Sequence, residues 1–215
     1  MASWVSFDCY GTLIDWDRGI GDALTGLWPD ADRERLLTVY HAVEPVIQEM
    51  RPALSYREVL DGARGAVASI LGLDPGTGNV LADSLPSWPP FPEVPDVLRH
   101  LRESGRRLAI LSNTDRDLLA ASIERIGVPF DVTVTAADAG SYKPAPGHWE
   151  RFDALSGARE AHVHVAASLF HDIEPCSRMG IPAVWINRLG EESDLPRAAE
   201  LATLQGLPET LEGGI

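Results

Sequence analysis

Four polar residues follow apolar or strand-like stretches at widely separated points of the chain, and their side chains could do chemistry together. Asp8 ends the run WVSF, and Ser112 closes the run RRLAILS. Lys143 follows the segment TAADAGSY, and Asp172 follows HVHVAASLFH. Two carboxylates, a hydroxyl group and an ammonium group are side chains that enzyme sites use for nucleophilic and acid–base work.

The elements that would position these residues alternate along the second part of the chain. The apolar patterns predict strands over 107–112, 131–135, 162–166 and 182–186, and helices over 93–104, 115–126, 146–156 and 172–179. Such alternation predicts a parallel sheet with helices on both faces. Ligand sites in these sheets lie outside the carboxyl ends of the strands. We therefore expect Asp8, Ser112, Lys143 and Asp172 to converge on one rim.

The first predicted strand is separated from the next by a segment of helical character. Apolar residues at Leu36, Tyr40, Val43, Ile47 and Met50 recur every three or four positions and form one helical face. A second helix begins with the capping-box pattern of Ser55 and Glu58. The proline-rich stretch SWPPFPEVP then ends the helical segment.

These patterns predict a doubly wound, Rossmann-like α/β fold with two domains. Residues 1–15 and 89–215 would form the core domain, and residues 16–88 would form a helical cap domain inserted after the first strand.

Composition excludes several classes of function. Hydrophobic residues make up 45% of the 215 residues, which indicates a globular protein. The net charge of −14 argues against nucleic acid and against an acidic membrane surface as partners. Two cysteines, Cys9 and Cys176, without the spacing of a disulfide framework or zinc site favour a reducing compartment, and we expect a cytoplasmic protein. If the substrate is an anion, the site must supply its own cations.

The motifs FDxYGTLxD, LSN, YKPAP, HVAASLFHDI and GIPAVWINR, in this order over 7–188, resemble the haloacid dehalogenase superfamily, and within it the type II 2-haloacid dehalogenases. The resemblance implies Asp8 as the nucleophile that forms an ester, and Thr12 as the hydroxyl group that holds it. It implies Ser112 as the group that binds the substrate's anionic end. Lys143 would be the cation beside the nucleophile, and Asp172 would order Lys143 and the hydrolytic water.

The same resemblance implies the residues that bind substrate. Main-chain N–H groups after Asp8, at Cys9 and Tyr10, would receive the carboxylate of a small anionic organic substrate, a 2-haloalkanoate. Asn113 would cradle the leaving halide, and Trp149 stands near the place of a pocket tyrosine. The resemblance implies no cofactor and no metal, and since family members are often dimers, a homodimer is a further expectation.

Two positions separate this chain from the magnesium-dependent phosphatases of the superfamily. Tyr10 stands where they carry a second aspartate, which protonates the leaving alkoxide, and Ala167 stands where they carry a metal ligand. Halide leaves without a proton, so a dehalogenase can dispense with that acid. A magnesium ion enters only under the phosphatase alternative. A third alternative is a weakly active protein with a binding or regulatory role.

One departure and several alternative interpretations remain. Dehalogenases carry a halide-binding arginine early in the cap, whereas the stretch LTVYHAVEP has none, and neither Tyr40 nor His41 is an equivalent replacement. Glu44 in this stretch lies near the apolar face of its helix and is either solvated or directed into the cap. Asp8, Ser112, Asn113 and Asp172 could simply cap turns or helices. Cys9 and Trp149 could be packing residues.

Overall fold

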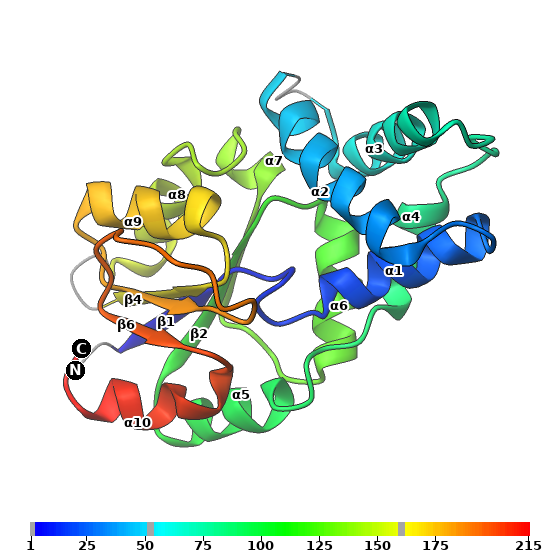
Figure 1. The fold of residues 1–215 in the computed structure, drawn as a ribbon. Helices are drawn as coiled ribbons and strands as arrows, with labels where there is room; N and C mark the ends of the chain where they lie inside the picture. Colours follow the sequence, from blue (N-terminus) through cyan, green and yellow to red (C-terminus); the bar gives the residue numbers. More distant parts are fainter. Residues whose placement is uncertain (1–2, 51–53, 159–161) are drawn as a thin grey trace.

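The computed structural model describes residues 3–50, 54–158 and 162–215. Within them, six parallel strands form one sheet in the order β3-β2-β1-β4-β5-β6 (Figure 1). The strands are β1 (Trp4–Phe7), β2 (Arg107–Ser112), β3 (Val132–Thr135), β4 (His162–Ala166), β5 (Ala183–Ile186) and β6 (Ala199–Leu201). The chain order reverses between β1 and β4. In open parallel sheets, such a switch point is where ligands bind.

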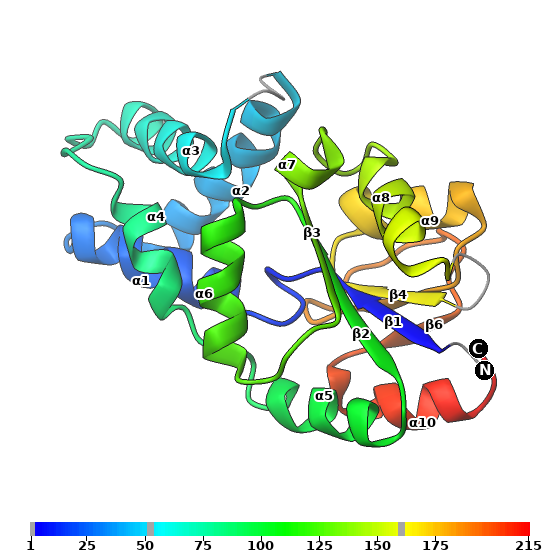
Figure 2. The same cartoon turned by 180° about the vertical axis from the view of Figure 1, so that it is seen from behind.

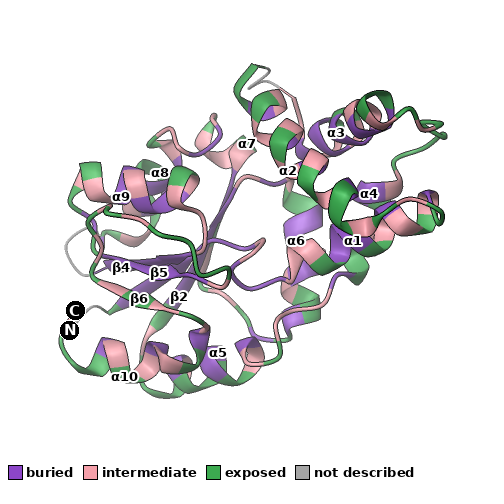
Figure 3. Cartoon of the chain, in the orientation of Figure 1, coloured by how far each residue is buried: buried purple, intermediate pink, exposed green. Residues whose placement is uncertain are grey.

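Helices cover both faces of the sheet, as predicted (Figures 1 and 2). One face is covered by α5 (Val94–Glu103), α6 (Arg116–Ile126) and α10 (Leu207–Glu212), and the other by α8 (Gly147–Ser156) and α9 (Glu174–Met179). All four residues of β1 are buried, and the sheet is the most deeply buried layer in Figure 3. The predicted doubly wound α/β fold is therefore confirmed.

The segment between β1 and β2 is helical, also as predicted. It contains α1 (Trp16–Leu27), α2 (Arg33–Met50), α3 (Tyr56–Leu71), α4 (Val80–Ser84) and the 3₁₀ turn η1 (Leu85–Ser87). These elements, here called the helical insertion, form a lobe beside the sheet (Figure 1). The capping box at Ser55 and Glu58 is present, and α3 ends at Gly72 with φ +68°, a left-handed conformation that favours glycine. The division into two domains stays a prediction.

The buried face of α2 differs from the predicted apolar stripe. Its buried residues are Leu36, Tyr40, Glu44 and Gln48, which step by four, whereas Met50 is 75% exposed. The predicted apolar residues are the buried ones in the first half of α2 only, at Leu36 and Tyr40. In the second half, this face borders a cavity, and polar side chains take the buried positions.

Several elements lie outside the sequence prediction. The short helix α7 (Ala136–Ala139), the edge strand β6, the 3₁₀ turn η4 (Leu204–Gly206) and α10 were not predicted. A π-helical turn, η3 (Leu169–Ile173), stands before α9, where the sequence predicted a single helix. Among the described helices, none combines the length and the apolar character needed to cross a membrane.

Candidate active site

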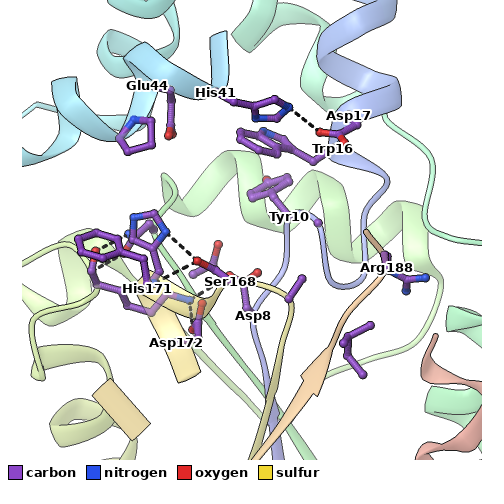
Figure 4. A pocket seen from close by; sticks show the side chains of 18 of the residues that line it. Asp8, Tyr10, Trp16, Asp17, His41, Glu44, Ser168, His171, Asp172 and Arg188 are labelled. Atoms are coloured by element: carbon purple, nitrogen blue, oxygen red, sulfur yellow. Dashed lines mark hydrogen bonds and ion pairs between the residues drawn. The ribbon is translucent and has the colours of Figure 1, made fainter. Parts of the chain in front are cut away.

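The structure brings the four chemistry-bearing residues of the strand ends together. Asp8 follows β1, Ser112 ends β2, Lys143 lies in the loop between α7 and α8, and Asp172 lies in η3 after β4. All four line one cavity of about 860 Å³ at the carboxyl edge of the sheet, facing the helical insertion (Figure 4). This volume falls in the usual range for small-molecule sites.

Lys143 stands at the centre of the site and is the single lysine of the 215-residue chain. Its Nζ donates to Asp8 Oδ1 at 2.9 Å, to Asp172 Oδ1 at 2.6 Å and to the carbonyl of Leu111 at 2.8 Å. The residue is 2% exposed. Burial alone would lower the pKa of Lys143, but the carboxylates of Asp172 and Asp8 outweigh it and raise the pKa well above its ordinary value. The ammonium group is therefore a fixed positive charge.

Asp8 is held at both carboxylate oxygens. Lys143 binds Oδ1, and Thr12 Oγ1 donates to Oδ2 at 2.9 Å. The Thr12 hydroxyl in turn accepts from the main-chain N–H of Ala167 at 2.9 Å. The turn that returns Thr12 to Asp8 passes through Gly11 at φ +84°. The motif therefore fixes the orientation of one carboxylate at the cavity wall.

On the side away from the cavity, Asp172 is held by a buried series of hydrogen-bonded side chains that the sequence analysis did not predict. His164 Nε2 lies 2.8 Å from Asp172 Oδ1, and Ser6 Oγ lies 2.8 Å from His164 Nδ1 and 2.6 Å from His162 Nε2. Burial alone would raise the pKa of Asp172, but Lys143 and His164 lower it well below the ordinary value. Buried parallel strands normally contain apolar residues, so the polar residues within these two strands were the sequence signal that could have indicated this hydrogen-bonded network.

Asn113 connects the site loops rather than standing free in the cavity. Its Oδ1 accepts from the main-chain N–H of Lys143 at 2.6 Å, and its Nδ2 donates to the Lys143 carbonyl at 3.0 Å. The same Nδ2 lies 3.3 Å from Gln48 Oε1 on α2. The amide thus fixes the lysine loop and links it to the helical insertion. Ser112, its neighbour, is buried and lines the cavity.

The three remaining predicted residues have different positions. The Tyr10 ring lines the cavity, and its hydroxyl group lies 3.0 Å from Ser122 Oγ on α6. Burial raises the pKa of Tyr10 well above its ordinary value, so the phenol is neutral. The side chain of Cys9 is fully buried in the core. Trp149 is 1% exposed and packs against the ring of His164, in the core between α8 and the sheet.

The expected contact of Trp149 with substrate is corrected accordingly. Among the described residues that line the cavity, neither Trp149 nor Cys9 is present. Trp149 faces the sheet because α8 packs its apolar side there, so the ring supports His164. Cys9 has no accessible surface, so its expected contact with substrate is corrected in the same way.

The opposite wall of the cavity comes from α1 and α2. Trp16, His41, Glu44 and Gln48 line it, and His41 Nε2 pairs with Asp17 Oδ1 at 3.0 Å (Figure 4). Glu44, left open by the sequence, is buried, and burial raises its pKa to about 7. Arginine is absent from this wall among the described residues.

Local cations are present at the cavity, and both are already paired. The cavity lining within the described residues includes Lys143 and Arg188. Arg188 Nη2 donates to Glu93 Oε1 at 2.8 Å and to the Thr12 carbonyl at 2.9 Å. An anionic substrate would therefore meet hydrogen-bond donors beside compensated charges.

A family model described as haloacid dehalogenase-like hydrolase matches residues 3–163 of the chain. The chain belongs to the haloacid dehalogenase-like hydrolases. The fold of the sheet and the order of the motifs along its carboxyl edge agree with this membership, and the resemblance inferred from the motifs is confirmed at the level of the family.

Individual relatives within this family are dehalogenases. The chain is 28% identical to an (S)-2-haloacid dehalogenase of Pseudomonas sp. (strain YL), over 97% of this chain and 94% of that protein. It is 27% identical to haloacetate dehalogenase H-2 of Moraxella sp. (strain B), over 86% of both. The L-2-haloacid dehalogenase of Xanthobacter autotrophicus, solved with chloropropionic acid covalently bound, has the same fold (TM-score 0.86, 21% identity, full coverage of both chains).

The donor set at the site does not fit the magnesium ion that phosphatases of this superfamily use. A magnesium site needs several oxygen ligands around one point. Here the Lys143 ammonium group occupies the space between Asp8 and Asp172, and Ala167 offers no side-chain oxygen. Within the described residues, no group of three acidic, histidine or cysteine side chains is arranged to hold a metal.

Proposed function

We propose that the protein is a hydrolase that removes halide from C2 of a small 2-haloalkanoate and produces the 2-hydroxy acid. The observation that carries the proposal is the Asp8 carboxylate, held between Lys143 Nζ and Thr12 Oγ1 at the wall of the cavity. Tyr10, which stands where the phosphatases carry the second aspartate, is a neutral phenol turned toward Ser122. This arrangement suits displacement of a group that leaves without a proton.

In the first half-reaction, Asp8 attacks C2 of the substrate. The substrate carboxylate binds at Ser112 and at the main-chain N–H group of Tyr10. A carboxylate oxygen of Asp8 forms a bond to C2, the carbon–halogen bond breaks, and the halide leaves with the bonding electrons. Attack from the side opposite the halogen inverts the centre. Because both oxygens of Asp8 are already oriented, little ordering is left for the reaction itself.

In the second half-reaction, water hydrolyses the Asp8 ester. Asp172 and Lys143 orient a water molecule, which attacks the ester carbonyl carbon. The bond between that carbon and the former Asp8 oxygen now joined to C2 breaks, and the 2-hydroxy acid leaves with this oxygen. The Asp8 carboxylate is restored with the oxygen of the water molecule, and one proton is released. Lys143 stabilises the negative charge that develops on the ester oxygen, which is an electrostatic role for a fixed cation.

The relatives support this substrate class. Those named above act, by their names, on (S)-2-haloacids and haloacetate, and one was captured with chloropropionic acid covalently bound. A covalently bound acid is the species that a nucleophilic mechanism predicts.

The test is a comparison of two substrates with and without EDTA. Pure protein is incubated with L-2-chloropropionate and with p-nitrophenyl phosphate, and released chloride and phosphate are measured. The proposal expects chloride release that EDTA does not change. Phosphate release that EDTA abolishes would favour the phosphatase alternative, and release of neither ion would favour a binding or regulatory role.

A further inference from the structure

Glu44 is a buried acid that faces the site without a cation. It extends from α2 toward the loop that carries Ser168 and His171, across the cavity from Asp8 (Figure 4). The residue is 3% exposed. No ion pair of Glu44 exists within the described residues, where the Gln48 amide is the hydrogen-bond partner of its carboxyl group. An isolated buried carboxylate is costly, so such a group favours its neutral form.

The direction of the hydrogen bonds fixes which oxygen of Glu44 remains available. The main-chain N–H of Lys143 can only donate, so Asn113 presents Oδ1 to it and Nδ2 to Gln48. Gln48 therefore accepts at Oε1 and donates from Nε2 to Glu44 Oε1. This leaves Oε2 as the oxygen that can carry a proton and offer it to the cavity.

The titratable groups around Glu44 do not supply a neutralising cation. His41, on the same helix, is paired with Asp17 of α1. The tyrosines that interact with Glu44 come from α2, α3 and the loop before Lys143, and the charged or titratable groups across the cavity come from the strand-end loops. They are Tyr40, Tyr56, Tyr142, Asp8, Lys143, His171 and Asp172. Lys143 is already bound to Asp8 and Asp172, and Arg188, the other cation that lines the cavity, is bound to Glu93.

Glu44 lies where an in-line displacement would direct the leaving group. Asp8 attacks C2 from one side, so the departing halogen points away from Asp8 and toward the wall formed by α1 and α2. We propose that Glu44, in its protonated form, donates a hydrogen bond to the departing halide at this wall and thereby determines which leaving groups the site accepts. The inference rests on the function proposed above and extends it to a further substrate-contacting residue.

The bonding changes are simple. The carbon–halogen electron pair leaves with the halide, and the Glu44 O–H turns toward the new anion without giving up its proton. A hydrogen bond to an ion is stronger than one to a neutral group, so it strengthens as the charge develops. Fluoride and chloride, the stronger acceptors, should depend on Glu44 more than bromide. An ionised Glu44 would instead repel both the halide and the substrate carboxylate.

The decisive experiment is the pH dependence of kcat/KM for halide release from L-2-chloropropionate and L-2-bromopropionate. For the native protein, kcat/KM should fall about tenfold per pH unit above about pH 7. In Glu44→Gln, an amide donor replaces the acid at every pH, so this alkaline fall should disappear while activity at pH 6 stays within about threefold. Glu44→Ala should lose about tenfold or more at pH 6, with the larger loss for chloride.

Glu191→Gln is the matched control, because Glu191 is an exposed acid at the rim of the same cavity. It should keep the alkaline fall. If Glu44→Gln keeps the fall as well, or is as inactive as Glu44→Ala at pH 6, the inference is overturned while the proposed function stands. If the native protein releases no halide at any pH, both the proposed function and the role of Glu44 at the leaving group are refuted.

A measurement without substrate separates the protonation of Glu44 from turnover. Glu44 has a higher pKa in the folded protein, about 7, than its ordinary value of 4.5 in the unfolded chain, so the fold loses stability as pH rises from about 4.5 to about 7. Relative to the native protein, Glu44→Gln should therefore melt at a higher temperature at pH 8.5, and this difference should disappear at about pH 4. Equal melting temperatures at both pH values would contradict a neutral buried Glu44.

Discussion

The two walls of the cavity differ in how their charged groups are paired. On the strand-end wall, Asp8, Lys143 and Asp172 alternate in charge, and all three donors of the ammonium group are used. On the wall of the helical insertion, the rings of Trp16 and Tyr40 pack against each other, and the carboxyl group of Glu44 has one hydrogen-bond partner and no counter-ion within the described residues. The first wall is preorganised, and the second retains a group that can change its charge. Under the proposed function, the strand-end wall would carry out the reaction, and the wall of the insertion would select the substrate.

Replacing Asp8 should have the largest effect. In Asp8→Asn, an amide cannot attack C2, and kcat should fall by about 10⁴-fold or more. Steady-state halide release gives the loss. Repeated turnover in heavy-oxygen water should place the label in the Asp8 carboxylate of the native protein, since water attacks the ester carbonyl. Asp15→Asn, at the rim of the cavity, is the control. Full activity of Asp8→Asn would refute the assignment of the nucleophile.

Removing the central charge should damage both stability and activity. Lys143→Met leaves the buried Asp8 and Asp172 carboxylates facing each other without a cation. Breaking a buried ion pair in this way costs about 3–5 kcal/mol of the free energy of unfolding. Urea denaturation at pH 7 measures the loss. An unchanged denaturation midpoint would mean that the strand-end wall is less tightly coupled than its geometry indicates.

Loosening the chain behind Asp172 should affect catalysis more than binding. His164→Gln removes the ring nitrogen that bonds Asp172 and the contact with Ser6. Small misplacements of catalytic groups are costly, so kcat should fall about 10- to 100-fold with KM little changed. Separate determination of kcat and KM checks this expectation. A change in KM alone would assign His164 to substrate binding.

The sheet region and the insertion should respond to pH in opposite directions. Burial lowers the pKa of both His148 and His162 to about 3. Between pH 6.5 and pH 3 the unfolded chain binds these protons and the folded protein does not, so stability is lost as pH falls. The slope is up to about 1.4 kcal/mol per pH unit for each histidine. Urea denaturation of Glu44→Gln at pH 7 and pH 5.5 isolates this acid loss, because ionisation of Glu44 in the native protein changes stability in the opposite direction over part of the same pH range. A flat profile between these pH values would contradict two neutral buried histidines.

The smallest effect is expected at the N-terminus of α3. Ser55→Ala removes the capping box of α3 and should cost about 1 kcal/mol, or about 2–4 °C in melting temperature. Calorimetry measures the shift, and kcat should not change. A marked loss of kcat would show that the geometry of the cavity depends on the position of α3.

Sequence patterns could predict the strand-end wall because its residues follow strands, and parallel strands align their carboxyl ends. Asp8, Lys143 and Asp172 need only this topology to meet. The role of Glu44 could not be predicted, because periodicity identifies a buried face by its apolar residues, and this face becomes polar at a cavity. The roles of Ser6 and His164 could not be predicted for a related reason. Their strands were predicted from apolar residues, and residues inside such buried strands are expected to be apolar as well. The side of α8 that Trp149 occupies depends on helix rotation, which spacing alone does not give.

The single lysine of the chain makes the interior of the site observable from outside. Lys143 carries the only ε-amine, which is nearly inaccessible and held in its unreactive, protonated form. An amine-specific acylating reagent should leave it unmodified in the native protein and label it once the surrounding loops open. The rate at which this one residue acquires the label would therefore report how often the reaction centre opens, without a probe having to be introduced.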